Sequence, residues 1–256
     1  LNKLRNSPRY ELFQTQGTPL LIKALNELGA LCTKNHRDSY FEGAKLIDAE
    51  ALLKNYCLKS KACFSCPLHC SHYYVVRKGA YKTYGEGPEF ETLSGFGSRI
   101  LNDNIQSILK ANTLCNQLGL DVITTSHAIA LMMECFERGL VDEEFTGGLK
   151  FEWGDHELLI DLIPKIAYRQ GFGDVLAEGS LQVAKKIGKG AEKYVMHTKG
   201  LTYPSGDYRV RKGCGLALAV GTRGGDHLRG IPLIESFGLP PEDGVRLFGT
   251  PNAVDP

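Results

Sequence analysis

One stretch of the sequence decides what kind of fold surrounds it: Lys61-Ala62-Cys63-Phe64-Ser65-Cys66-Pro67-Leu68-His69-Cys70. It places three of the eight cysteines of the chain within a few residues, in the spacing Cys-x-x-Cys-x-x-x-Cys. An iron–sulfur cluster is held by four thiolates, and a compact loop can supply three of them while a distant part of the fold supplies the fourth. The stretch therefore predicts a metal-binding loop with Cys63, Cys66 and Cys70 as ligands.

Zinc is the main alternative occupant of this loop. Structural zinc sites tend to use two separated pairs of ligands, and the sequence has no second pair with that spacing. His69 and His72 are nevertheless close enough to complete a Cys3His zinc site. Three free thiols without a metal are the least favoured reading, because thiols packed this densely are prone to oxidation.

The composition describes an ordinary globular protein. Of 256 residues, 43% are hydrophobic and 23% are charged, and the formal net charge is +1. Basic residues are interleaved with acidic ones, and no apolar run approaches the ~18 residues of a membrane span. Clustered cysteines without a signal peptide indicate a reducing compartment rather than a disulfide framework. We therefore expect a soluble, cytoplasmic protein that binds neither nucleic acid nor a membrane.

The rest of the chain predicts a mainly α fold, a multi-helix domain with one small β-hairpin. The hairpin is expected over residues 71–81, where aromatic and β-branched residues flank Lys78-Gly79. Apolar spacing, caps and glycine stops predict helices over 19–29, 48–56, 104–118, 124–139, 153–170 and 175–187. Thr18 is expected to cap the first of these helices, and Gly119 is expected to end the third. A domain junction is expected near residues 195–200.

Three carboxylates follow the cysteine loop in a segment rich in glycine and apolar residues: Glu86, Glu89 and Glu91. A solvated loop is rarely this apolar, and we therefore expect at least one of the three acids to be partly buried. Burial raises the pKa of a carboxyl towards the range useful for general acid/base catalysis. The alternative is that these acids lie at a helix N-terminus, where the helix dipole favours them.

Two further segments suit a polar ligand. Gly119 and Asp121 lie between two predicted helices, where free backbone N–H groups and a carboxylate are exposed together. Glycine is dense over residues 212–230, where it permits close backbone approach to a ligand. Neither a phosphate loop nor a dinucleotide-binding fingerprint is completed. His227 is the histidine most suited to chemistry here, with a structural hydrogen bond as the alternative.

Taken in order, four motifs resemble the aldehyde ferredoxin oxidoreductase family, the tungsten (sometimes molybdenum) bis-pterin enzymes. The motifs are CFSCPLHC (63–70), GPEFET (87–92), NQLGLD (116–121) and GGDHLRG (224–230). The resemblance implies an enzyme that oxidises aldehydes to carboxylates and passes electrons through a 4Fe-4S cluster to ferredoxin. A homodimer is compatible with it.

The resemblance also implies roles for individual residues. Cys63, Cys66 and Cys70 correspond to the clustered ligands of the iron–sulfur cluster. Glu91, with Glu89 as second choice, corresponds to the carboxylate that handles the proton of an attacking water. His227 corresponds to the histidine that reaches the metal or the substrate oxygen. The pterin motif places Asn116, Gly119, Leu120 and Asp121 at the cofactor.

Some features depart from the family pattern. Asn116 replaces an acid of the pterin motif, which removes a charge but keeps a hydrogen-bonding group. Lys110 and Thr113 replace a Glu-x-x-His metal site found between subunits in some members. The fourth cluster cysteine is expected beyond the end of the chain, and the pterin-cradling β domain before its start. Residues 1–197 are accordingly expected to form the helical middle domain, and residues 198–256 the start of the C-terminal domain.

Two other functions stay open at this point. A relative that uses the same cofactor could reduce carboxylates or aromatic acyl thioesters. A module of a different class would use the three cysteines with His69 or His72 to hold zinc for structure only. On the leading interpretation the parent protein is the enzyme, and the chain alone is expected to be inactive.

Overall fold

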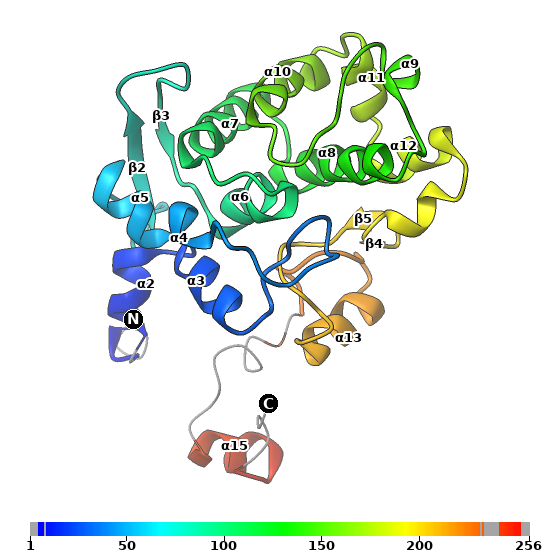
Figure 1. Cartoon of the computed structure of the whole chain (residues 1–256). Helices are drawn as coiled ribbons and strands as arrows, with labels where there is room; N and C mark the ends of the chain where they lie inside the picture. The colour runs from blue at the N-terminus through cyan, green and yellow to red at the C-terminus, as the bar shows by residue number, and fades with distance from the viewer. Residues whose placement is uncertain (1–4, 8, 231, 233–240, 252–256) are drawn as a thin grey trace.

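The computed structural model describes residues 5–7, 9–230, 232 and 241–251, and these residues are mainly helical (Figure 1). The α-helices are α2 (Tyr10–Gln16), α3 (Leu20–Glu27), α4 (Ala44–Ile47), α5 (Ala49–Asn55), α6 (Phe90–Gly95), α7 (Ile105–Leu118), α8 (Val122–Glu137), α9 (Glu143–Thr146), α10 (His156–Ala167), α11 (Phe172–Leu176), α12 (Ser180–Ile187), α13 (Lys212–Val220) and α15 (Pro241–Phe248). Two short 3-10 helices are η1 (Ser98–Ile100) and η2 (Ala191–Tyr194). The predicted mainly α fold is confirmed.

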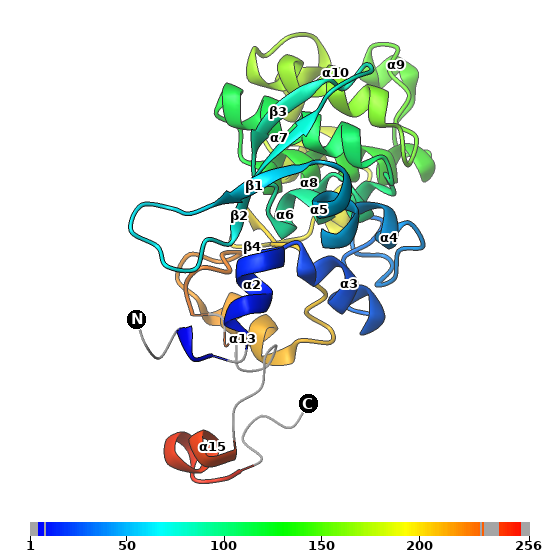
Figure 2. The ribbon, with the colours of Figure 1, turned by 90° about the vertical axis from the view of Figure 1, so that its left-hand side faces the viewer.

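The β structure is larger than the single hairpin that the sequence predicts. Strands β1 (Cys57–Lys61), β2 (Ser71–Val76) and β3 (Thr83–Glu86) form an antiparallel sheet in that order, and β4 (His197–Thr198) pairs with β5 (Leu201–Thr202). The expected hairpin is formed by β2 and β3, with Tyr74 opposite Gly85, but β3 lies beyond the predicted end at residue 81 because the connection spans residues 77–82. The cysteine loop joins β1 to β2 and projects from the sheet in Figure 2.

Helix α8 runs through the core. Residues 125–135 of this helix are all buried, as is typical of a helix that is covered on every side. Helix α6 packs against it so closely that a Cβ on Gly95 would lie 2.8 Å from the Ser126 hydroxyl. Apart from Glu91, which is half-buried, the side chains of α6 are also buried. The core therefore holds α6 rigidly, and with it the carboxylates at its first turn.

The helix ends show which sequence signals are local. Asn104 caps α7 by accepting hydrogen bonds from Gln106 N and Ser107 N, and Gly119 ends it with a left-handed φ of 70°. Helix α8 begins at Val122, before the predicted start at Thr124, because the Asp121 side chain accepts from Thr124 N. Thr18 does not cap α3, whose N-cap is Pro19. The predicted end at Gly119 is confirmed, and the predicted cap at Thr18 is wrong.

Two other expectations concern the second half of the chain. The helix predicted over 175–187 is two helices, α11 and α12, separated at Gly179, which has a φ of 81°. The predicted domain boundary after residue 197 falls inside β4, and the division into domains stays a prediction. The terminal residues 1–4 and 252–256 lie outside the described part.

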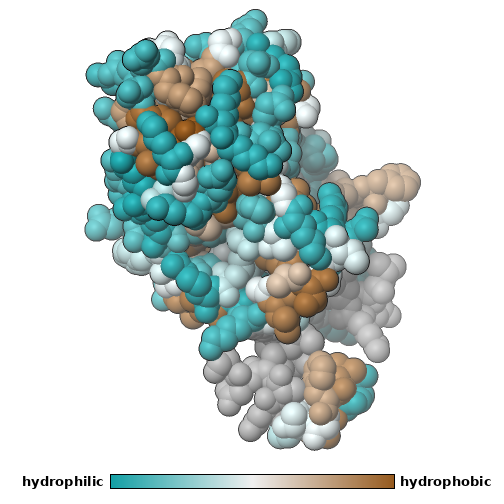
Figure 3. Space-filling view, turned by 90° about the vertical axis from the view of Figure 1, so that its right-hand side faces the viewer, coloured by the Kyte–Doolittle hydropathy of each residue, from teal (hydrophilic) through white to brown (hydrophobic). Residues whose placement is uncertain are grey.

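Figure 3 shows a face that is mainly hydrophilic in its upper half and has hydrophobic side chains lower down. Helix α13 exposes the side chains of Leu216 and Val220, whose exposed fractions are 64% and 69%.

Within the described residues, none of the helices combines the length and the apolar character needed to cross a bilayer.

Candidate functional site

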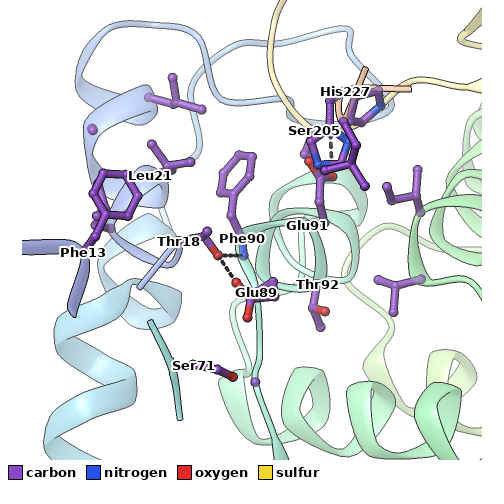
Figure 4. A pocket seen from close by; sticks show the side chains of 18 of the residues that line it. Phe13, Thr18, Leu21, Ser71, Glu89, Phe90, Glu91, Thr92, Ser205 and His227 are labelled. Atoms are coloured by element: carbon purple, nitrogen blue, oxygen red, sulfur yellow. Dashed lines mark hydrogen bonds between the residues drawn. The ribbon is translucent and has the colours of Figure 1, made fainter. Parts of the chain in front are cut away.

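Glu91 occupies the first turn of α6 and faces a large cavity. One of its carboxylate oxygens, Oε2, accepts a hydrogen bond from the backbone N–H of Ser205 at 2.7 Å, as Figure 4 shows. Burial raises the pKa of Glu91, and the nearby His227 and Arg99 oppose this shift. A half-buried carboxyl with a raised pKa is suited to accept and release a proton during catalysis. The expectation that one of the three acids is partly buried is therefore confirmed for Glu91.

Glu89 lies just before α6 and has a different environment. Its side chain is exposed and accepts a hydrogen bond from the Thr18 hydroxyl. The same hydroxyl accepts from Phe90 N at 2.8 Å, so Thr18 ties the start of α6 to the end of the α2–α3 connection (Figure 4). This tertiary contact explains why Thr18 is not the cap of its own helix. Glu89 and Glu91 both line the cavity, but only Glu91 points towards His227 in Figure 4.

His227 is positioned by the backbone of the two glycines that precede its neighbour Asp226. A Cβ on Gly224 would lie 2.3 Å from Thr198 O, and one on Gly225 would lie 2.4 Å from Leu201 O. The segment thus rests directly on the β4–β5 pair, which only glycine permits. The buried Asp226 then accepts from Leu228 N at 2.9 Å and ends the turn.

Gly225→Ala is expected to displace His227. The added Cβ would meet the carbonyl oxygens of Leu201 and Thr202 at 2.4 and 2.6 Å, so the two segments must separate. We expect a loss of about 1–3 kcal/mol in the free energy of unfolding, typical of overpacking, and a loss of activity in the full-length protein. Gly230→Ala is the control for lost stability alone: its Cβ would meet nothing within 4 Å, and alanine at its left-handed φ of 86° costs roughly 1–2 kcal/mol without pressing on the β4–β5 pair. Denaturant unfolding and turnover measure both variants. Equal activity in the two would show that the contact does not position His227.

The residues of the NQLGLD motif lie at the turn between α7 and α8. Asn116, Leu120 and Asp121 line the same cavity as Glu91 and His227, and its volume is about 2010 Å³. Asn116 and Asp121 are exposed there, whereas Gly119 shapes the turn without lining the cavity. Pockets for drug-sized ligands measure roughly 300–1,000 Å³. The cavity is therefore large enough for a bulky cofactor as well as a substrate.

Asp121 caps helix α8, a structural role that does not depend on any ligand. Its carboxylate accepts from Thr124 N at 2.7 Å and so caps α8. Asp121→Ala is expected to lower the free energy of unfolding by about 1 kcal/mol, whereas Asp121→Asn should change it by only a few tenths, because asparagine caps equally well. Urea unfolding measures both. A large loss of stability in Asp121→Asn would contradict the capping role. A loss of cofactor in Asp121→Asn without a loss of stability would show that the carboxylate binds the cofactor.

The three clustered cysteines lie on the loop between β1 and β2. Cys63 is exposed, Cys66 and Cys70 are half-buried, and Cys66 N donates to Cys63 O at 3.0 Å. Across the described residues, no three His, Cys, Asp or Glu side chains are arranged to hold a metal ion. The donor set itself, three thiols on one loop, fits an iron–sulfur cluster that takes its fourth ligand from elsewhere. None of the three clustered cysteines forms a disulfide.

The two histidines of the zinc alternative differ in their environments. His72 is buried in β2, and its Nε2 contacts Thr15 O at 3.0 Å. His69 is exposed on the loop. His72 therefore holds the sheet against the end of α2. If the loop bound zinc, His69 would have to be the fourth ligand.

Two residues of the site carry no signal in the sequence. Arg99 is fully buried in η1, and its Nη2 donates to the hydroxyl of Ser205 at 2.8 Å. Ser205 lies 106 positions further along the chain, in the loop after β5. Neither belongs to a motif, and only the fold brings them to Glu91.

A mainly α scaffold thus brings a half-buried glutamate, a histidine and the α7–α8 turn to one cavity and carries a loop of three cysteines, a combination suited to an oxidoreductase. The family described as "Aldehyde ferredoxin oxidoreductase, domains 2 & 3" matches residues 1–256, and the chain belongs to this family.

Several relatives support this assignment. The chain is 35% identical over 258 residues to the tungsten-containing aldehyde ferredoxin oxidoreductase of Thermococcus kodakarensis, and 36% identical over 260 residues to that of Pyrococcus furiosus. Each alignment covers 100% of this chain and 40% of the relative, so the chain spans about two fifths of their length. The WOR-like subunit of an aliphatic sulfonate oxidoreductase of Pyrococcus furiosus is 28% identical over 76% of this chain and 32% of its own.

A solved structure shares the fold. It is the active site complex BamBC of benzoyl coenzyme A reductase with 1,5-dienoyl-CoA, with a TM-score of 0.60 and 20% identity. The match covers 75% of this chain and 28% of the other. At this identity the likeness concerns the fold alone.

Proposed function

We propose that the protein containing this chain oxidises aldehydes to carboxylic acids in the cavity between Glu91, His227 and the α7–α8 turn. The observation behind the proposal is that Glu91 and His227 come from segments far apart in the sequence and line the same cavity. They are also close enough for His227 to lower the pKa of Glu91. A titrating carboxyl beside an imidazole is the pair that acid/base chemistry on a carbonyl requires.

The donor groups of the chain fit the cofactors of the family. Asn116, Gly119, Leu120 and Asp121 would hold a tungsten or molybdenum bis-pterin, since Asn116 and Asp121 present exposed polar side chains at the cavity wall. Cys63, Cys66 and Cys70 would hold a 4Fe-4S cluster. When bound, these groups supply the acceptor for two electrons and their route to ferredoxin. The free thiols agree with a cytoplasmic location.

The remaining task for this chain is to move protons. Conversion of an aldehyde and water to a carboxylate releases two electrons and three protons. Glu91 is placed to take the proton of the attacking water, because its pKa lies above that of an exposed glutamate. His227, which lies near Glu91 at the same cavity, is placed to orient the carbonyl oxygen of the substrate.

The test combines metal analysis with turnover of the full-length protein. We expect tungsten or molybdenum, about four iron atoms per chain, and aldehyde-dependent reduction of ferredoxin. Zinc near one per chain without a heavy metal would overturn the proposal in favour of a structural zinc module. Reduction of carboxylates or aromatic acyl thioesters, with no oxidation of aldehydes, would overturn the reaction while leaving the cofactors in place.

A further inference from the structure

Arg99 carries a buried positive charge that the proposed chemistry does not use. Its side chain is fully buried, and within the described part of the chain no carboxylate forms an ion pair with it. Nη1 donates to the hydroxyl of Ser126 at 2.6 Å and Nη2 to that of Ser205 at 2.8 Å, while Nε has no partner among the described residues. A buried cation is costly unless an opposite charge offsets it, so its position calls for an explanation.

Ser205 connects this cation to the cavity. Its backbone N–H donates to Glu91 Oε2 at 2.7 Å, and its hydroxyl oxygen accepts from Arg99 Nη2. A guanidinium can only donate hydrogen bonds, so the hydroxyl must act as an acceptor towards Arg99. Its own proton is then left for the Glu91 carboxylate, whose pKa the Ser205 side chain lowers through a hydrogen bond. One serine therefore lies between a buried cation and a half-buried anion.

The surroundings of Glu91 leave few groups that could offset its charge. The titratable or charged groups that act on it are His227, Arg99, Tyr208 and Cys32. Burial raises the pKa of the Tyr208 hydroxyl and of the Cys32 thiol, so both are neutral near pH 7. Besides the hydrogen bonds from Ser205, the charged groups that can favour an ionised Glu91 are thus His227 and Arg99, and Arg99 is the one whose charge does not depend on pH.

We propose that Arg99 is a positioning residue for Glu91, which it orients and keeps ionised through the hydroxyl of Ser205. The importance of this effect for catalysis rests on the proposed function, whereas its effect on the carboxylate does not. The arrangement places the permanent charge behind the wall of the cavity, since Glu91 and Ser205 line the cavity and Arg99 does not. Arg99 can therefore act on Glu91 without competing for the substrate.

The test follows the Glu91 carboxylate by infrared difference titration of the full-length protein with its cofactors. The band is assigned by its absence in Glu91→Gln. Arg99→Met removes the charge, and we expect the pH at which Glu91 protonates to rise by about one unit, with a smaller rise in Arg99→Lys. Ser126→Ala is the matched control, because it removes the other hydroxyl partner of Arg99 and leaves the Ser205 link intact. It should leave the titration of Glu91 unchanged.

A second comparison asks whether the effect runs through Ser205. Ser205→Ala keeps the backbone N–H bond to Glu91 but removes the hydroxyl, so Glu91 should again protonate at higher pH. Arg99→Met should then shift the titration by less than half as much in the Ser205→Ala background as in the parent. Unchanged titration in Ser205→Ala, or equal shifts in both backgrounds, would overturn the proposal. If Arg99→Met fails to fold, the contrast between Ser205→Ala and Ser126→Ala decides. Failure of the proposed function would show instead as absent aldehyde oxidation with the infrared shifts retained.

Discussion

Glu91→Gln in the full-length enzyme is expected to lower kcat/KM for aldehydes by about 10²–10⁴, the range that a positioned general base contributes. The amide keeps the size of the side chain and can still accept the hydrogen bond from Ser205 N, so the fold should be unaffected. What it loses is the ability to take a proton. Steady-state kinetics with one aldehyde at several concentrations measure the effect.

The pH profile makes this prediction sharper. Since burial raises the pKa of Glu91, the base form is lost at a higher pH than for an exposed glutamate. In the parent enzyme, kcat/KM should therefore fall as the pH decreases through this raised pKa. In Glu91→Gln the residual rate should no longer show that step.

Glu89→Gln is the matched control for this experiment. The two glutamates are two residues apart and both line the cavity, but Glu89 is exposed and bonded to Thr18. An amide oxygen at position 89 can accept the same hydrogen bond from Thr18, so only a small change in rate is expected. If Glu89→Gln showed the large loss and Glu91→Gln did not, the proton-handling role would belong to Glu89.

Cys66→Ser is expected to abolish the iron–sulfur cluster of the full-length protein, and with it the transfer of electrons to ferredoxin. Cys66 is the middle one of the three proposed ligands, and the hydrogen bond from its backbone N–H to Cys63 O shapes the loop. A serine preserves this backbone bond but supplies a hydroxyl instead of a thiolate. Visible absorbance, iron content and reduction of ferredoxin together measure the loss.

Cys57→Ser serves as the control for the cluster experiment. Cys57 is also half-buried, but it begins β1, outside the Cys-x-x-Cys-x-x-x-Cys spacing. Its substitution should leave iron content and absorbance unchanged. Normal absorbance and normal ferredoxin reduction in Cys66→Ser would remove Cys66 from the ligand set.

Features that depend on neighbouring residues were predictable from the sequence. Gly119 ends α7 as expected, because a left-handed residue after a helix is a local requirement. The burial of an acid in the segment after the cysteine loop also followed from the apolar residues around it. The grouping of Glu91, His227 and Asp121 at one cavity could be anticipated only through the resemblance to the family, because local spacing says nothing about long-range contacts.

Features set by tertiary contacts were missed. Strand β1 is mostly exposed and polar, so its sequence has no alternation to reveal it, and it forms by pairing with β2. Thr18 reads as a cap for the helix beside it, yet its hydroxyl bonds to Glu89 and Phe90, more than 70 positions away. Arg99 and Ser205 stand in no motif, and their contact depends on the complete fold.

The cap that Asp121 provides for α8 has a consequence for recognising distant relatives. Gly119 and Asp121 are each needed to stop one helix and start the next, whether or not a cofactor is ever bound. Selection for folding alone would therefore preserve a Gly-Leu-Asp signature in a descendant that had lost its redox chemistry. Asn116, which caps nothing in the described structure, is the position where such a loss would leave its mark.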